Sequence, residues 1–169
     1  MSSIFSIFWN ICLLKRGPQH VPTNSLFMLL LIAANLLVST FLNLRLYDEG
    51  TAPGVFAFMF ANLATATGIV WVALYLKKMI TRFPQTLSAM VGCDLLLTLL
   101  VAIVSLFTGD LKGQLTQGVI VLVGIWSVSV WGYILHHALA ITVFQGIFFA
   151  ITILLASIIL SGSLGLSTV

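Results

Sequence analysis

The stretch "LFMLLLIAANLLVSTFLNL", residues 26–44, contains no charged side chain. An α-helix rises about 1.5 Å per residue, so a helix over this stretch is long enough to cross the hydrocarbon core of a bilayer, which is about 30 Å thick. A membrane-spanning β-strand would instead show an alternating pattern over roughly ten residues, whereas this run is continuous and much longer. The stretch therefore predicts a transmembrane α-helix.

Four further apolar stretches follow the first one. They cover residues 55–76, 86–107 and 118–135, and a last stretch that begins between 138 and 144 and continues to about 160. Turn and capping residues separate the earlier stretches, as in "YDEGTAPG" and "RFPQT". The connector "HHALAIT" lacks such a breaker, so the pattern leaves the start of the fifth stretch open within these limits.

The composition of the whole chain agrees with a membrane as its solvent. Of 169 residues, 60% are hydrophobic and 7% are charged, and the mean hydropathy is +1.18. A soluble domain carries about 25% charged residues. We therefore expect an all-α integral membrane bundle of five transmembrane helices in residues 25–169, preceded by a head, residues 1–24, that carries an interfacial amphipathic helix.

The head is predicted to form its helix before Lys15. As a helix, it places its polar residues on one narrow stripe: Ser3, Ser6 and Asn10. No basic residue precedes its apolar part, unlike in a secretory signal peptide, and Lys15 and Arg16 follow it, where lipid phosphates lie. This pattern fits a simple membrane anchor, and it also fits a helix that senses the membrane or docks a partner.

The distribution of basic residues predicts the orientation of the bundle. One side carries five of them: Lys15, Arg16, Lys77, Lys78 and Arg82. The other side carries Arg45 and Lys112, both accompanied by acidic residues. Since cytoplasmic loops carry the excess of Lys and Arg, we expect a multi-pass protein of the bacterial inner membrane, with its N-terminus in the cytoplasm and its C-terminus outside.

Asp94 is the one acidic residue set deep inside an apolar span, within "SAMVGCDLLLTLLV", residues 88–101. It lies roughly 12 Å from the end of its helix, and a lipid-facing carboxylate at such depth costs about 2.5–3.5 kcal/mol. We therefore expect it to face the bundle interior together with Thr98, Ala102 and Ser105, which share its helix face. Its partner is expected to be an Asn, Ser or Thr on the first, second or fourth span.

Two interpretations of Asp94 remain open. It either belongs to a path for protons, ions or a substrate, or it forms a hydrogen bond that packs the helices together. A transporter usually carries more than one ionisable group at this depth, and no other Asp, Glu, Lys or Arg lies deep inside a span. This favours the packing interpretation.

The second span carries small residues on one face: Ala57, Ala61, Thr65 and Gly68. Small residues allow two helix backbones to approach closely, so this face predicts packing either within the chain or between two copies. Asn62 lies beside the face and is a second candidate for the intramembrane polar site. A polar pore is the weaker interpretation, because the face consists mostly of alanine.

In the fourth span, Trp131 and Tyr133 are predicted to anchor the helix at the membrane interface, and Trp126 is predicted to lie in the core. His136 and His137 are adjacent, so on a helix they point about 100° apart and do not form a two-ligand metal face. We expect them to cap the end of this helix, with His20 on the same side of the membrane.

No cofactor, metal, enzymatic activity or nucleic-acid partner is predicted. The chain has no serine-nucleophile elbow, phosphate-binding loop, HExxH or CxxC motif, and its basic residues lie where membrane topology places them. Cys12 and Cys93 both stand in apolar surroundings and are expected to be buried, reduced thiols. The predicted partners are the bilayer, other membrane proteins and further copies of the chain.

The five-span layout, with the segments "IWSVSVWGYILHHALAIT" and "ICLLKRGPQHVP", resembles the short bacterial branch of the Yip family of multi-spanning proteins, which are named for interacting with Ypt/Rab GTPases. The resemblance implies a non-enzymatic role in membrane organisation, as a scaffold, accessory subunit or recruiter of partners. The cytosolic motifs of the eukaryotic members are not recognisable here, so Rab binding does not carry over. A small transporter or channel-forming oligomer that uses Asp94 is the alternative.

The predicted orientation can be measured with reporter fusions at residues 20 and 169. Because the number of spans is odd, one reporter should be active in the cytoplasm and the other outside it, with residue 20 on the cytoplasmic side. Two cytoplasmic reporters would mean that a span is miscounted.

Overall fold

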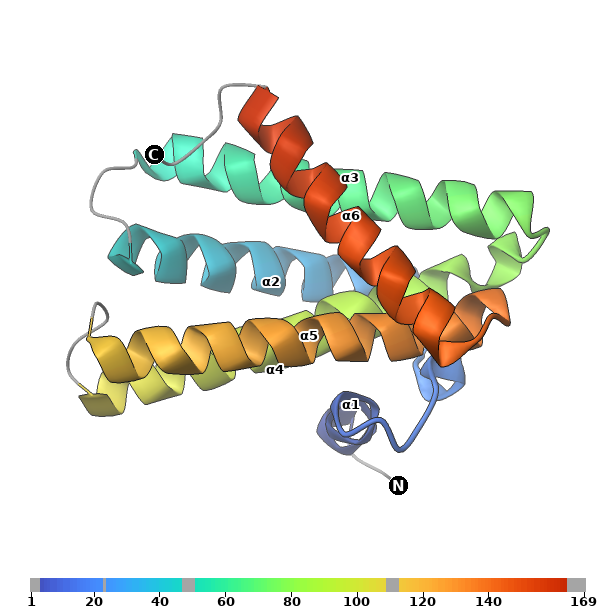
Figure 1. The fold of residues 1–169 in the computed structure, drawn as a ribbon, viewed down its shortest axis with the longest axis horizontal. Coiled ribbons are helices and arrows are strands. Elements are labelled where there is room, and N and C mark those ends of the chain that lie inside the picture. The colour runs from blue at the N-terminus through green and yellow to red at the C-terminus, as the bar shows by residue number, and fades with distance from the viewer. Residues whose placement is uncertain (1–3, 23, 47–50, 109–112, 164–169) are drawn as a thin grey trace.

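The computed structural model describes residues 4–22, 24–46, 51–108 and 113–163, which form six α-helices and two short 3-10 helices (Figure 1). The helices are α1 (Ile4–Cys12), η1 (Pro18–His20), α2 (Ser25–Leu46), α3 (Ala52–Leu76), η2 (Ile80–Arg82), α4 (Phe83–Thr108), α5 (Gln114–Leu139) and α6 (Val143–Ser163). Helices α2 to α6 are long and apolar enough to cross a membrane. The predicted all-α class, with five spans after a short N-terminal helix, is confirmed. Ser3 and Lys112 lie outside the described residues, as does the side chain of His20.

The fifth span begins at Val143, within the interval left open by the sequence. A reciprocal capping box fixes this start: the Gln145 amide N–H donates to Thr142 Oγ1 at 3.3 Å, and the Thr142 amide N–H donates to Gln145 Oε1 at 3.1 Å. The connector therefore does carry a helix-start signal, in the letters "TVFQ". The fourth span is longer than expected, because α5 continues to Leu139.

Three helices end with a residue other than glycine in the left-handed region. These residues are Leu14, Lys78 and Ala140, with φ of 58°, 57° and 50°. After each of them, the next amide donates to the carbonyl five residues earlier: Lys15 to Asn10, Met79 to Leu74, and Ile141 to His136. This is the Schellman arrangement, which pairs carbonyls that a helix end leaves free. It turns the chain sharply at one end of the bundle.

The five spanning helices form a closed ring, in which neighbours pack in the order α2, α3, α6, α5, α4 and back to α2. Helix α6 lies obliquely across α3 and α5 (Figure 1). Helix α4 buries 39% of its apolar span inside the protein, against 17–22% for the other four, and it packs against α2 and α5 in the ring and against α1 of the head.

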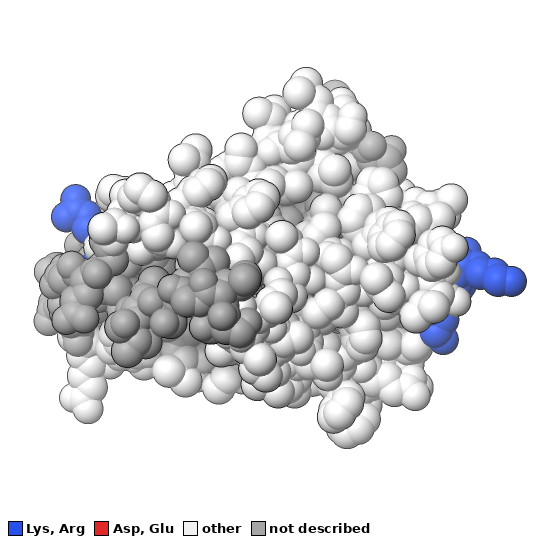
Figure 2. Space-filling view, turned by 90° about the horizontal axis from the view of Figure 1, so that it is seen from above, with Lys and Arg blue, Asp and Glu red and all other residues white. Residues whose placement is uncertain are grey.

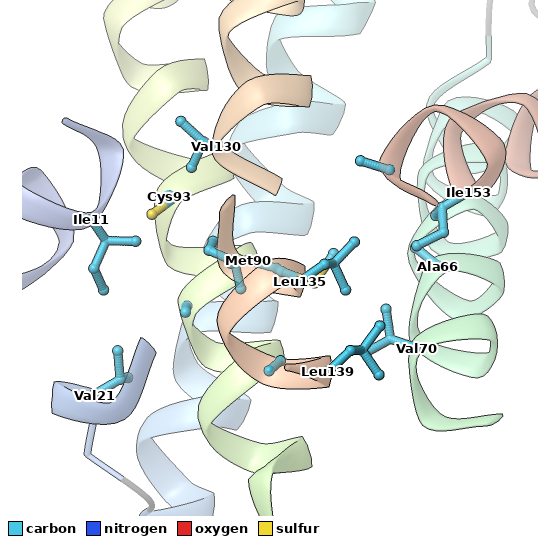
Figure 3. Packing of buried hydrophobic residues seen from close by; sticks show 14 of the residues in the cluster. Ile11, Val21, Ala66, Val70, Met90, Cys93, Val130, Leu135, Leu139 and Ile153 are labelled. Atoms are coloured by element: carbon cyan, nitrogen blue, oxygen red, sulfur yellow. The ribbon is translucent and has the colours of Figure 1, made fainter. Parts of the chain in front are cut away.

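The head is docked onto the bundle rather than simply lying beside it. Phe8 and Ile11 of α1 are buried, and a Cβ atom at Gly92 of α4 would collide with the Phe8 ring. Figure 3 shows Ile11 next to Cys93 of α4. The outward side of α1 carries Phe5 and Trp9, which are 60% and 48% exposed. The apolar face of α1 is therefore divided between the bundle and the surrounding lipid.

The small-residue packing lies at a different place from the one expected. Gly68 is exposed, and a Cβ atom built on it would meet no atom within 4 Å, so the expected close packing within the chain is wrong at this position. The close approach is made instead by α5 and α6, where a Cβ atom at Gly132 would lie 2.7 Å from Ile147 Cα and one at Gly146 would collide with the Gly132 carbonyl oxygen. Sequence identifies small residues, but it does not show which of them faces a neighbour. Packing between copies through Gly68 stays a prediction.

We expect Gly132→Ala to destabilise the protein, because the added methyl meets backbone atoms of Ile147 that cannot rotate away. Overpacking of this kind costs about 1–3 kcal/mol. Gly68→Ala is the matched control, and it should leave the thermal unfolding midpoint in detergent unchanged or raise it, because alanine favours a helix more than glycine does. Equal midpoints for the two variants would contradict the α5–α6 contact.

Candidate functional site

The ring of five helices encloses a cavity of about 240 Å³, and every spanning helix contributes to its wall. Most of the wall is apolar, as at Met59 and Leu63, with a small number of polar side chains. The polar members are Asn35, Ser39, Asn62, Asp94, Ser127 and Ser157. A mostly apolar cavity with a few convergent polar groups is the usual form of a small-molecule binding site.

Asp94 lines this cavity and is hydrogen-bonded to a neighbouring span. The Asn35 side-chain amide of α2 donates to Asp94 Oδ2 at 3.1 Å, and Asn35 is only 6% exposed. This confirms that Asp94 faces the interior and bonds to an Asn, Ser or Thr of another span.

The partner of Asp94 could have been identified as Asn35 from the sequence, by comparing the depth of the two residues along their helices. It lies ten residues after Ser25, and Asp94 lies eleven residues after Phe83. Helices α2 and α4 begin at the same end of the bundle (Figure 1). At about 1.5 Å per residue, the two side chains are therefore at nearly equal depth.

Two polar atoms of the cavity wall have no hydrogen-bond partner. They are Asn62 Oδ1 and Trp131 Nε1, both buried. A buried polar atom left without a partner costs about 1–3 kcal/mol, and because both atoms are fully buried, a molecule in the cavity would bond to them only after a change of side-chain rotamer. Asn62, predicted as part of the polar site, thus shares a cavity with Asp94, whereas Thr98 is not among the residues of the cavity wall.

A second cavity, of about 20 Å³, adjoins the first and shares four wall residues with it: Leu63, Ala66, Asp94 and Trp131. Its remaining wall includes Thr67 and Val70 of α3 and Met90 of α4. This volume is enough for about one water molecule. Asp94 and Trp131 therefore stand between a large and a small cavity.

The predictions for two tryptophans were wrong. Trp131 lines the cavity instead of anchoring the helix at the membrane interface, and Trp126 is 43% exposed instead of lying in the core. The Trp126 indole N–H donates to the Cys12 carbonyl oxygen at 3.1 Å, at the end of α1. The two side chains are five residues apart on one helix and so point about 140° apart, which forces one outward when the other lines the cavity.

The other predicted packing residues lie toward the outside of α3. Thr65 Oγ1 donates to the Ala61 carbonyl oxygen at 2.8 Å, so its hydroxyl is satisfied within its own helix, and Ala57 is half-buried. Thr65 and Gly68 line an apolar groove of about 430 Å³ between α3 and α6.

The five predicted interface cations, Lys15, Arg16, Lys77, Lys78 and Arg82, are all exposed. We call the end of the bundle where α3 ends and α4 begins the basic end. His136 and His137 occupy the last turn of α5 there: His136 Nδ1 contacts the Ile141 carbonyl, and His137 Nδ1 donates to the Tyr133 carbonyl oxygen at 3.1 Å. Among the described residues, no three His, Cys, Asp or Glu side chains come together as metal ligands would.

Comparison with protein-family models, with curated proteins and with solved structures finds no match for this chain. The resemblance to Yip proteins therefore stays a prediction from the sequence alone.

The Asn35–Asp94 bond predicts different effects of two substitutions. Asp94→Leu leaves the Asn35 amide without an acceptor and should lower the free energy of unfolding by about 1–2 kcal/mol. Asp94→Asn keeps an acceptor oxygen in place and should unfold close to wild type. Thermal unfolding in detergent measures both, with Thr98→Val, one turn along α4, as the control. If the Leu variant is as stable as the Asn variant, the bond does not stabilise the bundle.

Proposed function

We propose that this protein is a non-enzymatic carrier that binds a small hydrogen-bond-donating cation in the central cavity, with Asp94 as its main contact. The observation that supports this proposal is the cavity wall itself: all five spans contribute to it, and it holds one carboxyl and no cationic side chain. An intramembrane carboxyl that faces a cavity is the typical recognition group of an ion or substrate path. The sequence alone favoured a packing role, because it did not show that a cavity adjoins Asp94.

The chemistry of the wall indicates the kind of solute. Asp94 supplies an oxygen acceptor at the cavity wall, and a change of rotamer would turn the buried Asn62 Oδ1 toward the cavity as a second one. The Trp131 indole adds an aromatic face that attracts cations. A small protonated amine or a guanidinium group would donate to both oxygens. Since one water occupies about 30 Å³ of liquid, the volume of about 240 Å³ equals that of about eight waters, which sets the size of the solute together with its accompanying waters.

Passage of a solute requires the route toward the basic end to open. On that side of Asp94 the small cavity is closed by Leu87, Met90 and Val70, which pack tightly between α3 and α4. Trp131 belongs to the wall of both cavities, so a change in its rotamer would join them. In this proposal, the basic end faces the cytoplasm of a bacterial inner membrane.

A second candidate function is that of a membrane scaffold, as the resemblance to Yip proteins implies. The groove between α3 and α6 supports it, because its wall is apolar and includes the exposed Gly68, where another helix could approach closely. The outward aromatic side chains of α1, Phe5 and Trp9, offer a further surface for a partner or a further copy of the chain.

The carrier proposal can be tested without knowing the solute. In a Cys12→Ala/Cys93→Ala background, Ser39→Cys places a thiol in the cavity wall. In proteoliposomes, this thiol should react at least about tenfold faster with the cationic reagent 2-aminoethyl methanethiosulfonate than with its anionic sulfonatoethyl analogue, because the Asp94 carboxylate attracts the cation. Asp94→Asn should remove the preference.

Gly124→Cys is the control, since a Cβ atom at Gly124 meets no protein atom within 4 Å and the position faces outward. Its thiol should react slowly with both reagents. Equal rates for the two reagents at Ser39→Cys, or no reaction there, would exclude a cation-binding cavity.

A further inference from the structure

A polar cavity of about 180 Å³ lies at the basic end, well away from Asp94. Three parts of the chain that are distant in sequence form it: η1 of the head, the η2–α4 junction and the last turn of α5. Its wall carries a guanidinium at Arg82, an imidazole at His137 and two carboxamides at Gln19 and Gln85. This combination consists mainly of hydrogen-bond donors and contains no acid.

The segments that connect the helices at the basic end contain no acidic residue. The four acidic residues of the chain are Asp48, Glu49, Asp94 and Asp110, and none belongs to residues 13–24, 77–85 or 136–142, which connect the helices at the basic end. Figure 2 shows basic side chains projecting at the two ends of the molecule. The cavity therefore lies in a positive potential that favours an anion.

Arg82 and His137 are held in place by their own bonds. Arg82 Nη1 donates to the His137 carbonyl oxygen at 3.3 Å, which uses one of the five N–H groups of the guanidinium. The bond from His137 Nδ1 to the Tyr133 carbonyl oxygen fixes the orientation of the imidazole ring. The second ring nitrogen, Nε2, takes no part in this bond. Gly17 lies so close that a Cβ atom there would be 2.9 Å from His137 Cδ2, so the head backbone packs against the imidazole ring.

A simpler explanation is that Arg82 only caps α5. Its bond to the His137 carbonyl satisfies one of the free carbonyls at the C-terminus of α5, and a cation there is also favoured by the helix dipole. That role needs one N–H group. It does not account for a cavity to which Gln19 of the head and Gln85 of α4 also contribute polar side chains.

We propose that the cavity at the basic end binds a phosphate group. The guanidinium of Arg82 would pair with two phosphate oxygens, as guanidinium groups commonly do, and the carboxamides of Gln19 and Gln85 would donate to the remaining ones. The phosphate belongs either to the headgroup of an anionic phospholipid or to a small phosphorylated solute. The site is independent of the carrier proposal, because it shares no residue with the cavity of Asp94.

The test uses the full chain in nanodiscs and measures the thermal unfolding midpoint. In one arm, glycerol 3-phosphate is titrated against protein in phosphatidylcholine nanodiscs; in the other, phosphatidylglycerol replaces part of the phosphatidylcholine. A ligand that binds the folded state raises the midpoint with its concentration. We expect a rise in at least one arm, and the arm that responds identifies the source of the phosphate.

Arg82→Gln should weaken the binding at least about tenfold, since it removes a charge-assisted pair. Gln85→Leu keeps the Arg82 cap on α5 and should weaken the binding by several-fold, which separates phosphate binding from capping. Lys77→Gln removes the same charge from an exposed position outside the cavity wall and should have little effect.

Three results would overturn the proposal. They are the absence of a rise in both arms for the wild-type protein, equal weakening by Lys77→Gln and Arg82→Gln, and unchanged binding in Gln85→Leu. Equal weakening would mean that the positive potential attracts phosphate without a specific site.

Discussion

The architecture depends on the need to keep the Asp94 carboxyl away from lipid. Hydrocarbon offers no hydrogen bonds, so a carboxyl near the middle of a span must find its partner inside the protein. The Asn35 amide on α2 provides this partner. The helix that carries the carboxyl, α4, also buries more of its span than any other spanning helix. The polar interaction and the packing thus constrain the same helix.

The head contributes to this arrangement from the opposite side of α4. Cys93 directly precedes Asp94, and it lies in the contact with α1, where its thiol donates weakly to the Phe8 carbonyl oxygen at 3.9 Å. Gly92 lets the Phe8 ring lie against the helix backbone. Three consecutive residues of α4 therefore join the head to the cavity. A displacement of α1 by a partner or by the membrane would act directly on the helix segment that positions Asp94.

The fold class was predictable because the length and apolarity of a span are properties of a single segment. The inward direction of Asp94 was predictable for a similar reason, since its solvation cost does not depend on which helix is its neighbour. The ends of the helices were harder to predict from the sequence. Leu14, Lys78 and Ala140 adopt the left-handed conformation that glycine usually provides, so no glycine announces these turns.

Features that depend on the contact between two segments could not be predicted from the sequence pattern of either segment alone. The roles of Trp126 and Trp131 were exchanged because periodicity shows that they point apart but not which of them meets the interior. The sequence singled out the face of Gly68, whereas the contact that requires glycine is at Gly132, because that contact depends on where α6 crosses α5. The cavity at the basic end joins residues more than a hundred positions apart, and no sequence pattern connects them.

The cavity of Asp94 is difficult to explain as packing alone. If these polar residues served only to hold the helices together, they would be expected to satisfy one another, because a partly satisfied polar group in an apolar interior is less stable than an apolar replacement. Asn62 Oδ1 and Trp131 Nε1 remain buried without partners although Asp94 lines the same cavity. Leucine at position 62 would fill part of the cavity and remove the free-energy cost of the unpaired Asn62 oxygen. We therefore favour a bound solute over a purely structural role, because Asp94 adjoins a cavity to which all five spanning helices contribute.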